Sequence, residues 1–262
     1  SLPSESARVS PYLIRTALEK PLSYQLLIST ADDIPNAIDA LHKVNADAID
    51  LNMGCPAPNV GRMGAGIRLM EKPEEVRLIV CEARRRTQLP LTAKIRLGIE
   101  LDEQKLKVFC TMLEDEGIDL ISVHARTKEE SFARRPRWEW IARVKEWLKI
   151  PVIANGGIFS IKDAEDCLRI SGADGLMIGR AAVAKPWLFA EIARDVYGCK
   201  IAEPQISLPL VYGNFIDLIN ELFRPEHRIG RLKQFTPYFA QNYKFGHTLA
   251  TRVQSSKSVA EA

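Results

Sequence analysis

The chain has 262 residues, of which 46% are hydrophobic and 26% charged, an ordinary globular composition with ample length for a large core. The formal net charge at pH 7 is +3, and no apolar run approaches the ~20 residues that cross a membrane. We therefore expect one barrel-sized domain plus a short appendage, with no membrane partner.

The cysteines and histidines give no sign of a metal or disulfide framework. The five cysteines are scattered and contain no Cys-x-x-Cys pair, and the four histidines show no ligand spacing. This pattern argues against a zinc site and favours a reducing compartment. Because the chain also begins without a signal-peptide pattern, we expect a cytoplasmic protein that holds no metal.

Short apolar runs alternate with segments of helical periodicity between residues 22 and 178. The predicted strands are 22–28, 48–51, 91–97, 120–123, 151–154 and 175–178. The predicted helices are 11–19, 34–44, 73–86, 102–116, 137–148 and 161–171. The strands are continuously apolar, which is typical of a parallel sheet covered on both faces.

This alternation predicts an α/β fold of the TIM (β/α)8 type. Such a barrel has eight strands, and an open barrel would expose two unpaired edges, so we expect the first strands to be missing from this chain. After residue 181 only helices are predicted, at 208–223, 229–245 and 250–260. The expected domains are a barrel of residues 1–198 and a small helical domain of residues 199–262.

Cys55 lies directly after the second predicted strand. A lone cysteine beside a strand is most often a small buried hydrophobe. Here Pro56 stops the strand, and the glycines of 61–66 free the loop that follows, which a packed core does not require. Because the loops after barrel strands face the active site, we interpret Cys55 as a candidate proton donor or nucleophile.

Other polar residues lie within or just after the predicted strands, where the strands of a barrel converge on one mouth. Each alone has a structural explanation, such as an ion pair for a lysine or a helix cap for a histidine. So many positions at one level are hard to attribute to packing, and they predict one shared site. Together with Cys55 they are Gln25, Lys94, His124, Asn155 and the pair Gly179-Arg180.

The last two loops indicate what this site binds. Asn155-Gly156-Gly157 and Gly179-Arg180 follow the final two strands, where barrels commonly bind phosphate through glycine amides at a helix start. A phosphate there and a buried Lys94 suit FMN, because the cation stabilises the negative N1–C2=O edge of reduced flavin. Gln25 offers one donor and one acceptor, which matches the edge of a pyrimidine-like ring.

Six motifs occur in this order along the chain: Asp50-Leu51-Asn52-Met53-Gly54-Cys55-Pro56, Gly64-Ala65-Gly66, Lys94-Ile95-Arg96-Leu97-Gly98, His124-Ala125-Arg126-Thr127, Asn155-Gly156-Gly157-Ile158 and Gly179-Arg180. Together they resemble the tRNA-dihydrouridine synthases over roughly residues 21–189, with weaker similarity through the helical tail. The resemblance implies an FMN-dependent oxidoreductase that reduces the C5–C6 double bond of selected uridines in tRNA. The implied reductant is NADPH, with NADH as the other possibility.

The resemblance also implies residue roles. Cys55 corresponds to the proton donor to uracil C5, and Asn52 and Arg126 correspond to contacts with the target uracil. The implied cofactor contacts are Gln25, Lys94, His124, Asn155, Gly156, Gly157, Gly179 and Arg180. A thiol that donates a proton must stay protonated, so we expect no activating base beside Cys55. Two departures are the absence of the family's opening Ala-Pro-Met strand and Gly157 where the family usually has Asp.

A basic stretch at residues 126–149 and the basic tail gain a role from this resemblance. On charge alone such a run is a solvated helix face, whereas in a tRNA enzyme it would contact phosphates. The tail candidates are Arg228, Arg231, Lys233, Lys244, Arg252 and Lys257. We expect tRNA as the partner of a monomeric protein.

Two other functions remain open on the sequence. One is an FMN-dependent barrel reductase of a free pyrimidine or enone, similar to the dihydroorotate dehydrogenases. The other is a non-catalytic tRNA-binding module with a decayed site. The basic helical tail and the Asn-Met-Gly-Cys-Pro motif favour the tRNA enzyme over the first, and the retained Cys55 and Lys94 argue against the second.

Overall fold

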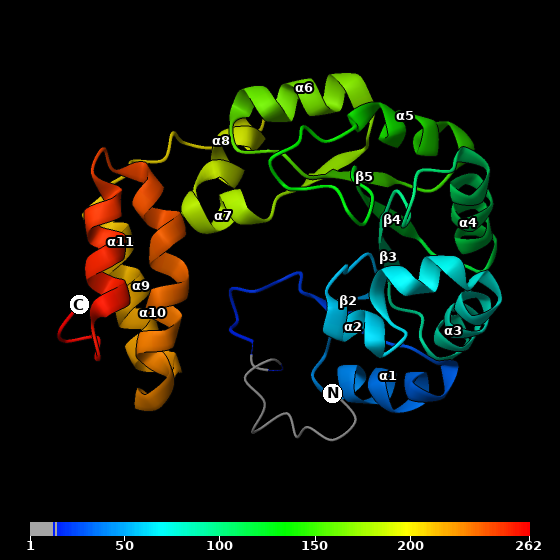
Figure 1. Cartoon of the computed structure of the whole chain (residues 1–262), viewed down its shortest axis with the longest axis horizontal. Coiled ribbons are helices and arrows are strands. Elements are labelled where there is room, and N and C mark those ends of the chain that lie inside the picture. Colours follow the sequence, from blue (N-terminus) through cyan, green and yellow to red (C-terminus); the bar gives the residue numbers. More distant parts are fainter. Residues whose placement is uncertain (1–12, 14) are drawn as a thin grey trace. The chain divides into compact units, whose positions relative to one another are not determined.

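The computed structural model describes residue 13 and residues 15–262, and it contains one parallel sheet (Figure 1). Six strands cross this sheet in chain order, each paired in parallel with the next. They are β1 Ser23–Leu26, β2 Ala48–Met53, β3 Leu91–Arg96, β4 Leu120–His124, β5 Val152–Asn155 and β6 Gly175–Met177. All six predicted strands are confirmed, with small shifts at their ends.

Helices connect the strands, as the periodicity predicts. They are α1 Ile34–Lys43, α3 Pro73–Arg86, α4 Glu103–Asp115, α5 Trp138–Trp147 and α6 Ile161–Ser171. Local chemistry sets their ends: a proline begins α3, and the carboxylate of Asp102 caps α4 by accepting from the backbone N–H of Lys105 at 3.0 Å. Three shorter elements carry too few turns for a periodic signal and were not predicted: η2 Ala31–Asp33, α2 Pro58–Arg62 and η3 Gly66–Glu71.

The core lies between these helices and one face of the sheet. In α1 the side chains of Ile34, Ala37, Ile38 and Leu41 recur at helical spacing, and each is at most 1% exposed. Alternate strand residues such as Ile49 and Ile95 are equally buried. In Figure 1, α1, α3, α4 and α5 lie outside the strands. The remaining strand side chains point to the opposite face of the sheet, which is where polar residues collect.

The chain divides into two compact units. The first comprises residues up to Gly157 together with Cys167–Met177, and it holds the whole sheet. The second comprises Ile158–Asp166 together with Ile178–Ala262. The sequence predicts domains of residues 1–198 and 199–262, whereas the compact units are divided at other residues. The predicted division stays a proposal about which segments fold independently.

The second unit is helical. Its helices are α7 Arg180–Ala184, α8 Leu188–Asp195, α9 Leu208–Leu222, α10 Pro225–Phe239 and α11 Gly246–Ser255, with the 3-10 turn η4 Ala240–Asn242. Helices α9, α10 and α11 lie side by side around a core of Ile219, Leu232 and Val253 (Figure 1). The three predicted tail helices exist, but the second and the third each begin and end earlier than expected. Helices α7 and α8 were not predicted.

A proline inside α10 is compensated from the neighbouring helix. Pro237 has no N–H to donate to the carbonyl of Lys233, one turn earlier. The side chain of Gln254 in α11 donates to that carbonyl at 2.8 Å instead. The bond satisfies the orphaned acceptor and joins the two helices.

The helix expected at 11–19 is not present where the structure describes it. Residues 11, 12 and 14 lie outside the described part, and residues 15–20 contain only a turn at 17–18. Arg15 explains this, because its guanidinium pairs with Asp47 at 2.8 Å and donates to the carbonyls of Asn45 and Glu19. Tertiary contacts therefore override the helical pattern.

Among the described residues, no helix combines the length and apolar character needed to cross a bilayer.

Candidate active site

The parallel register places five of the predicted residues in level rows on the face of the sheet opposite the helices, namely Gln25, Asn52, Lys94, His124 and Asn155, whereas Cys55, Gly179 and Arg180 lie beyond the paired strands. Residues paired across parallel strands project to the same side, so each row gathers side chains that are far apart in the sequence. From the amino towards the carboxyl ends of the strands, the rows are Gln25–Asp50–Thr92, then Asn52–Lys94–Ser122, then Arg96–His124–Asn155.

The first row is a hydrogen-bonded chain centred on Asp50. Its carboxylate accepts from Thr92 Oγ1 at 2.5 Å and from Gln25 Nε2 at 2.7 Å. Asp50 is only 7% exposed, and this burial raises the pKa of its carboxyl, although both hydrogen bonds and Lys94 oppose the shift. Sequence reasoning quoted Asp50 in a motif but missed its place in the site and missed Thr92 altogether.

Asn52 holds the loop that carries Cys55. Its Oδ1 accepts from the backbone N–H groups of Gly54 at 3.1 Å and Cys55 at 3.0 Å, and its Nδ2 donates to Gln25 Oε1 at 2.7 Å. The Asn52 side chain thus links the β2–α2 turn to the first row. Its predicted contact with uracil stays a prediction, as does the flavin contact of Gln25.

Gly66 allows the loop to close over Cys55. The carbonyl of Cys55 accepts from the backbone N–H of Ile67 at 3.1 Å. Gly66, which directly precedes Ile67, has φ +63°. A Cβ at this position would lie 2.6 Å from that carbonyl oxygen, so only glycine fits without a shift. Within the described residues no imidazole or carboxylate hydrogen-bonds to the half-buried sulfur of Cys55.

Two cations lie within electrostatic range of this sulfur. Burial lowers the pKa of Lys94, the nearby charge of Arg96 lowers it further, and Asp50 and an ionised Cys55 oppose the change. Burial and then the charge of Arg126 likewise lower the pKa of Arg96. Arg96 donates to the carbonyl of Thr127 at 2.9 Å and is 4% exposed. Like Asp50, Arg96 is a charged group of the site that sequence reasoning quoted in a motif but did not select.

His124 is held by Arg126 and packed against Gly156. Arg126 Nη1 lies 3.0 Å from His124 Nε2, and because a guanidinium can only donate, the imidazole accepts there and is neutral. Gly156 has φ +107°, and a Cβ on it would lie 2.6 Å from His124 Cδ2. The glycine of the Asn155-Gly156-Gly157 turn is therefore required for close contact with the histidine ring.

Arg126 is an internal anchor of the loop after β4. It is 2% exposed, and its Nη2 donates to the carbonyls of Phe132 and Arg134. Phe132 is 54% exposed and stacks on the His124 ring with centroids 5.9 Å apart. Sequence reasoning missed Phe132, for which the only signal was an aromatic residue in a polar loop. The uracil contact assigned to Arg126 remains a prediction.

The two predicted phosphate loops belong to different units. In the first unit, Asn155 Nδ2 donates to the carbonyl of Met177 at 2.7 Å and so joins the ends of β5 and β6. In the second unit, Gly179 precedes α7 and the guanidinium of Arg180 lies 5.4 Å from the ring centre of Phe159. Their joint role at a phosphate stays a prediction.

Comparison with known proteins decides the family. The model of the dihydrouridine synthase (Dus) family matches residues 5–236. This chain belongs to the dihydrouridine synthase family. It is 36% identical over 246 residues to the tRNA-dihydrouridine(16) synthase of Neisseria meningitidis serogroup A, covering 92% of this chain and 73% of the relative.

Further similar proteins support the same family assignment. The tRNA-dihydrouridine(16) synthase of Pseudomonas putida is 34% identical over 87% of this chain and 72% of its own. Among solved structures, histamine dehydrogenase from Rhizobium sp. 4-9 superposes with a TM-score of 0.50 at 15% identity, covering 63% of this chain and 27% of the other, which bears on the fold alone. The predicted α/β barrel fold and the predicted family are confirmed, and the protein is a flavin-dependent oxidoreductase.

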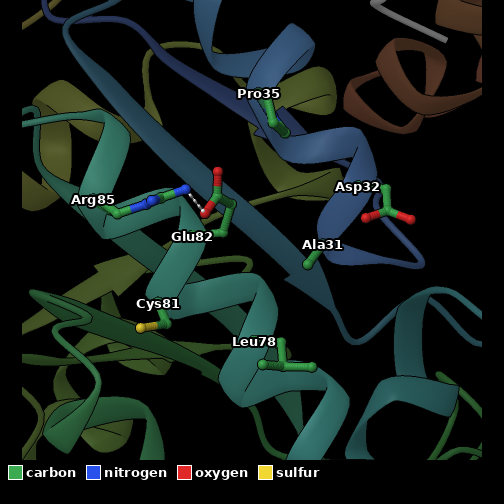
Figure 2. A pocket seen from close by; sticks show the side chains of 7 residues that line it. All are labelled: Ala31, Asp32, Pro35, Leu78, Cys81, Glu82 and Arg85. Atoms are coloured by element: carbon green, nitrogen blue, oxygen red, sulfur yellow. Dashed lines mark hydrogen bonds and ion pairs between the residues drawn. The ribbon is translucent and has the colours of Figure 1, made fainter.

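Two hollows lie on the first unit of this dihydrouridine synthase. One, of about 410 Å³, adjoins the loop after Cys55. The other is lined by η2, α1 and α3. Glu82 pairs with Arg85 at 2.5 Å in its wall, and the dashed line in Figure 2 marks this pair. None of the predicted site residues lines this second hollow.

Within the described residues, no three His, Cys, Asp or Glu side chains are grouped as metal ligands.

Proposed function

We propose that this protein is a tRNA-dihydrouridine synthase that reduces the C5–C6 double bond of specific uridines in tRNA, with FMN as its flavin and NADPH or NADH as reductant. The observation that carries the proposal is the position of Cys55, held by Asn52 at the carboxyl end of β2, beside the row that contains Lys94. The family match supports this function and neither of the two alternatives.

The residues present fit a flavin. The polar rows offer a half-buried cation in Lys94, and the neutral His124 ring lies beside the close backbone turn at Gly156. We assign Lys94, His124, Gln25 and the 155–157 turn to the FMN site, and Gly179 and Arg180 to its phosphate. Bound flavin would supply the hydride that adds to uracil C6.

Cys55 would then deliver the thiol proton to uracil C5 on the opposite face of the base. The C–H bond forms as the S–H bond breaks, and the thiolate that remains regains a proton from water. Lys94 and Arg96 are in electrostatic range of the sulfur and would stabilise this thiolate. The side chain of Asn52 is the proposed contact to the uracil itself. The buried Arg126, expected from the resemblance to contact the uracil as well, is proposed to hold the His124 ring and the loop after β4 in place beside the base.

The target uridine must leave its stack to reach the site, so the protein must hold the surrounding RNA. Much of the basic 126–149 stretch is already used, since Arg126 is buried, Arg137 pairs with Glu130 and Lys145 pairs with Asp174. In the tail, Arg228 donates to the carbonyls of Phe223 and Asn220 and so caps α9. The remaining tail candidates are Arg231, Lys233, Lys244, Arg252 and Lys257. We propose a cytoplasmic monomer as the working form.

Reduction of unmodified tRNA transcripts by the purified protein tests the proposal. With NADPH, the flavin-loaded enzyme should form dihydrouridine in tRNA and leave free uracil and uridine unchanged. Reduction of the free pyrimidines instead would favour the small-molecule reductase. A colourless protein that cannot be reconstituted with FMN would favour the non-catalytic module. Mapping of dihydrouridine in tRNA from cells that lack this gene should identify the modified position.

A further inference from the structure

The hollow of about 410 Å³ beside the catalytic loop has a role that neither the family nor the proposed chemistry assigns. One wall begins at Pro56, directly after Cys55, and continues through α2 and the start of η3 to Arg68. The facing wall is formed by Lys128 and Glu129, in the loop after β4. All of these residues belong to the first unit, so the hollow is part of one compact body with Cys55.

The charges around this hollow are unbalanced. Arg62 and Arg68 are exposed, and within the described residues neither pairs with a carboxylate. Lys128 is neutralised by Glu129, whose carboxylate lies 2.7 Å from the ammonium group. The two arginines therefore leave a local excess of positive charge. By contrast, Arg77, Arg84, Arg85 and Arg86 of α3 all pair with Asp or Glu.

The backbone that carries the two arginines is tied to Cys55. Arg68 follows Ile67, whose N–H donates to the carbonyl of Cys55 at 3.1 Å. Its side chain lies across α2, since a Cβ on Gly61 would be 3.7 Å from Arg68 Cγ and 3.8 Å from Nε. Arg62 is the last residue of the same short helix. A ligand held by these guanidinium groups would thus have a set position relative to the sulfur.

We propose that this hollow binds a backbone phosphate of the RNA strand that carries the target uridine. The inference rests on the proposed function. Guanidinium groups match phosphate oxygens in both charge and geometry. The base that receives the proton of Cys55 must lie at this loop, so the phosphate attached to its own nucleotide must pass close by. NADPH or NADH, which would reduce the flavin, also carries phosphates. Neither dinucleotide is attached to the base at the Cys55 loop, so nothing requires its phosphates to lie near Arg62 and Arg68.

The test compares Arg62→Gln, Arg68→Gln and the double variant in the full-length, flavin-loaded protein. The Kd for fluorescently labelled, unmodified tRNA transcript and the KM values for tRNA and NADPH are measured over a range of salt. Each single variant should raise Kd and KM for tRNA by roughly fivefold, and each lost contact should lower the slope of log K against log salt by about 0.7. The KM for NADPH should stay at the wild-type value, and Arg68→Lys should recover part of the loss.

Lys107→Gln is the matched control, because Lys107 is an exposed lysine of α4 with no carboxylate partner among the described residues. It should leave Kd and KM for tRNA unchanged. The proposal is overturned if neither arginine variant changes the Kd for tRNA beyond this control. A rise in the KM for NADPH alone would also overturn it, because the hollow would then serve the dinucleotide. If the wild-type protein binds tRNA but forms no dihydrouridine, the proposed function is wrong. The Kd values of the arginine variants for tRNA would still decide whether the hollow binds an RNA phosphate.

Discussion

Replacing Gly156 with alanine should destabilise the protein and disturb the flavin site together. Gly156 has φ +107°, which L side chains rarely adopt, and the added Cβ would lie 2.6 Å from His124 Cδ2 and 2.9 Å from Nε2. The His124 ring has little freedom to move, because it is 6% exposed, stacks on Phe132 and is bonded to Arg126.

The magnitude follows from two contributions. The backbone conformation alone costs about 1–2 kcal/mol for an alanine, and forcing a methyl group against a fixed ring adds about 1–3 kcal/mol. Gly172→Ala is the control for a positive φ without a steric contact, because Gly172 has φ +59° and a Cβ there would meet nothing within 4 Å. We therefore expect Gly156→Ala to lower the free energy of unfolding by about 1–3 kcal/mol more than Gly172→Ala.

Urea-induced unfolding of the two variants and the wild type measures this difference, and the flavin-to-protein absorbance ratio after purification reports on the site. Gly156→Ala should lose both stability and flavin, whereas Gly172→Ala should lose a little stability and keep its flavin. Equal destabilisation of the two variants, with flavin retained in both, would refute the close contact between Gly156 and His124.

Three further changes test the site. Cys55→Ala should retain flavin and NADPH oxidation but lose most dihydrouridine formation in tRNA, and loss of flavin instead would mean that the thiol has a different role. Asn52→Ala removes the acceptor of two backbone N–H groups and should cost about 2 kcal/mol in urea unfolding, whereas Asn52→Asp keeps an acceptor and should cost less. Burial raises the pKa of Asp50 above its ordinary value of 3.8, so the folded state binds a proton more tightly than the unfolded state does. Stability should therefore fall as pH rises from about 4 through the raised pKa, and Asp50→Asn should abolish that part of the pH dependence. Identical pH profiles for Asp50→Asn and the wild type would contradict this assignment.

Gly157 illustrates how a departure from the family pattern acquires a physical reason. The resemblance leads one to expect aspartate at this position. Gly157 has φ +76°, and a Cβ there would lie 2.5 Å from Cγ of the buried Pro136. The loop after β4 fills the space that a side chain would need, so in this chain the turn is compatible with glycine.

Much of the fold was predictable because hydrophobic spacing records which face of each element is buried. The four residues of α1 that recur at helical spacing, from Ile34 to Leu41, are the ones the structure buries. The tail was predicted less well, because the bounds of α10 depend on Pro225 at its start and on the bond from Gln254 that offsets Pro237.

The sequence by itself determined which strand ends carry polar side chains, because each strand of a parallel sheet delivers its last residues to the same edge, and Cys55, Lys94 and His124 could be selected as candidates by position alone. Only the tertiary structure decided which side chains are partners. Asp50 meets Thr92 through strand register, although 42 residues separate them. Arg126 is buried in a loop and Arg62 is exposed beside a hollow, yet both are arginines in polar segments. Whether such a group anchors the protein or faces a ligand depends on distant residues that surround it, and local sequence carries no record of them.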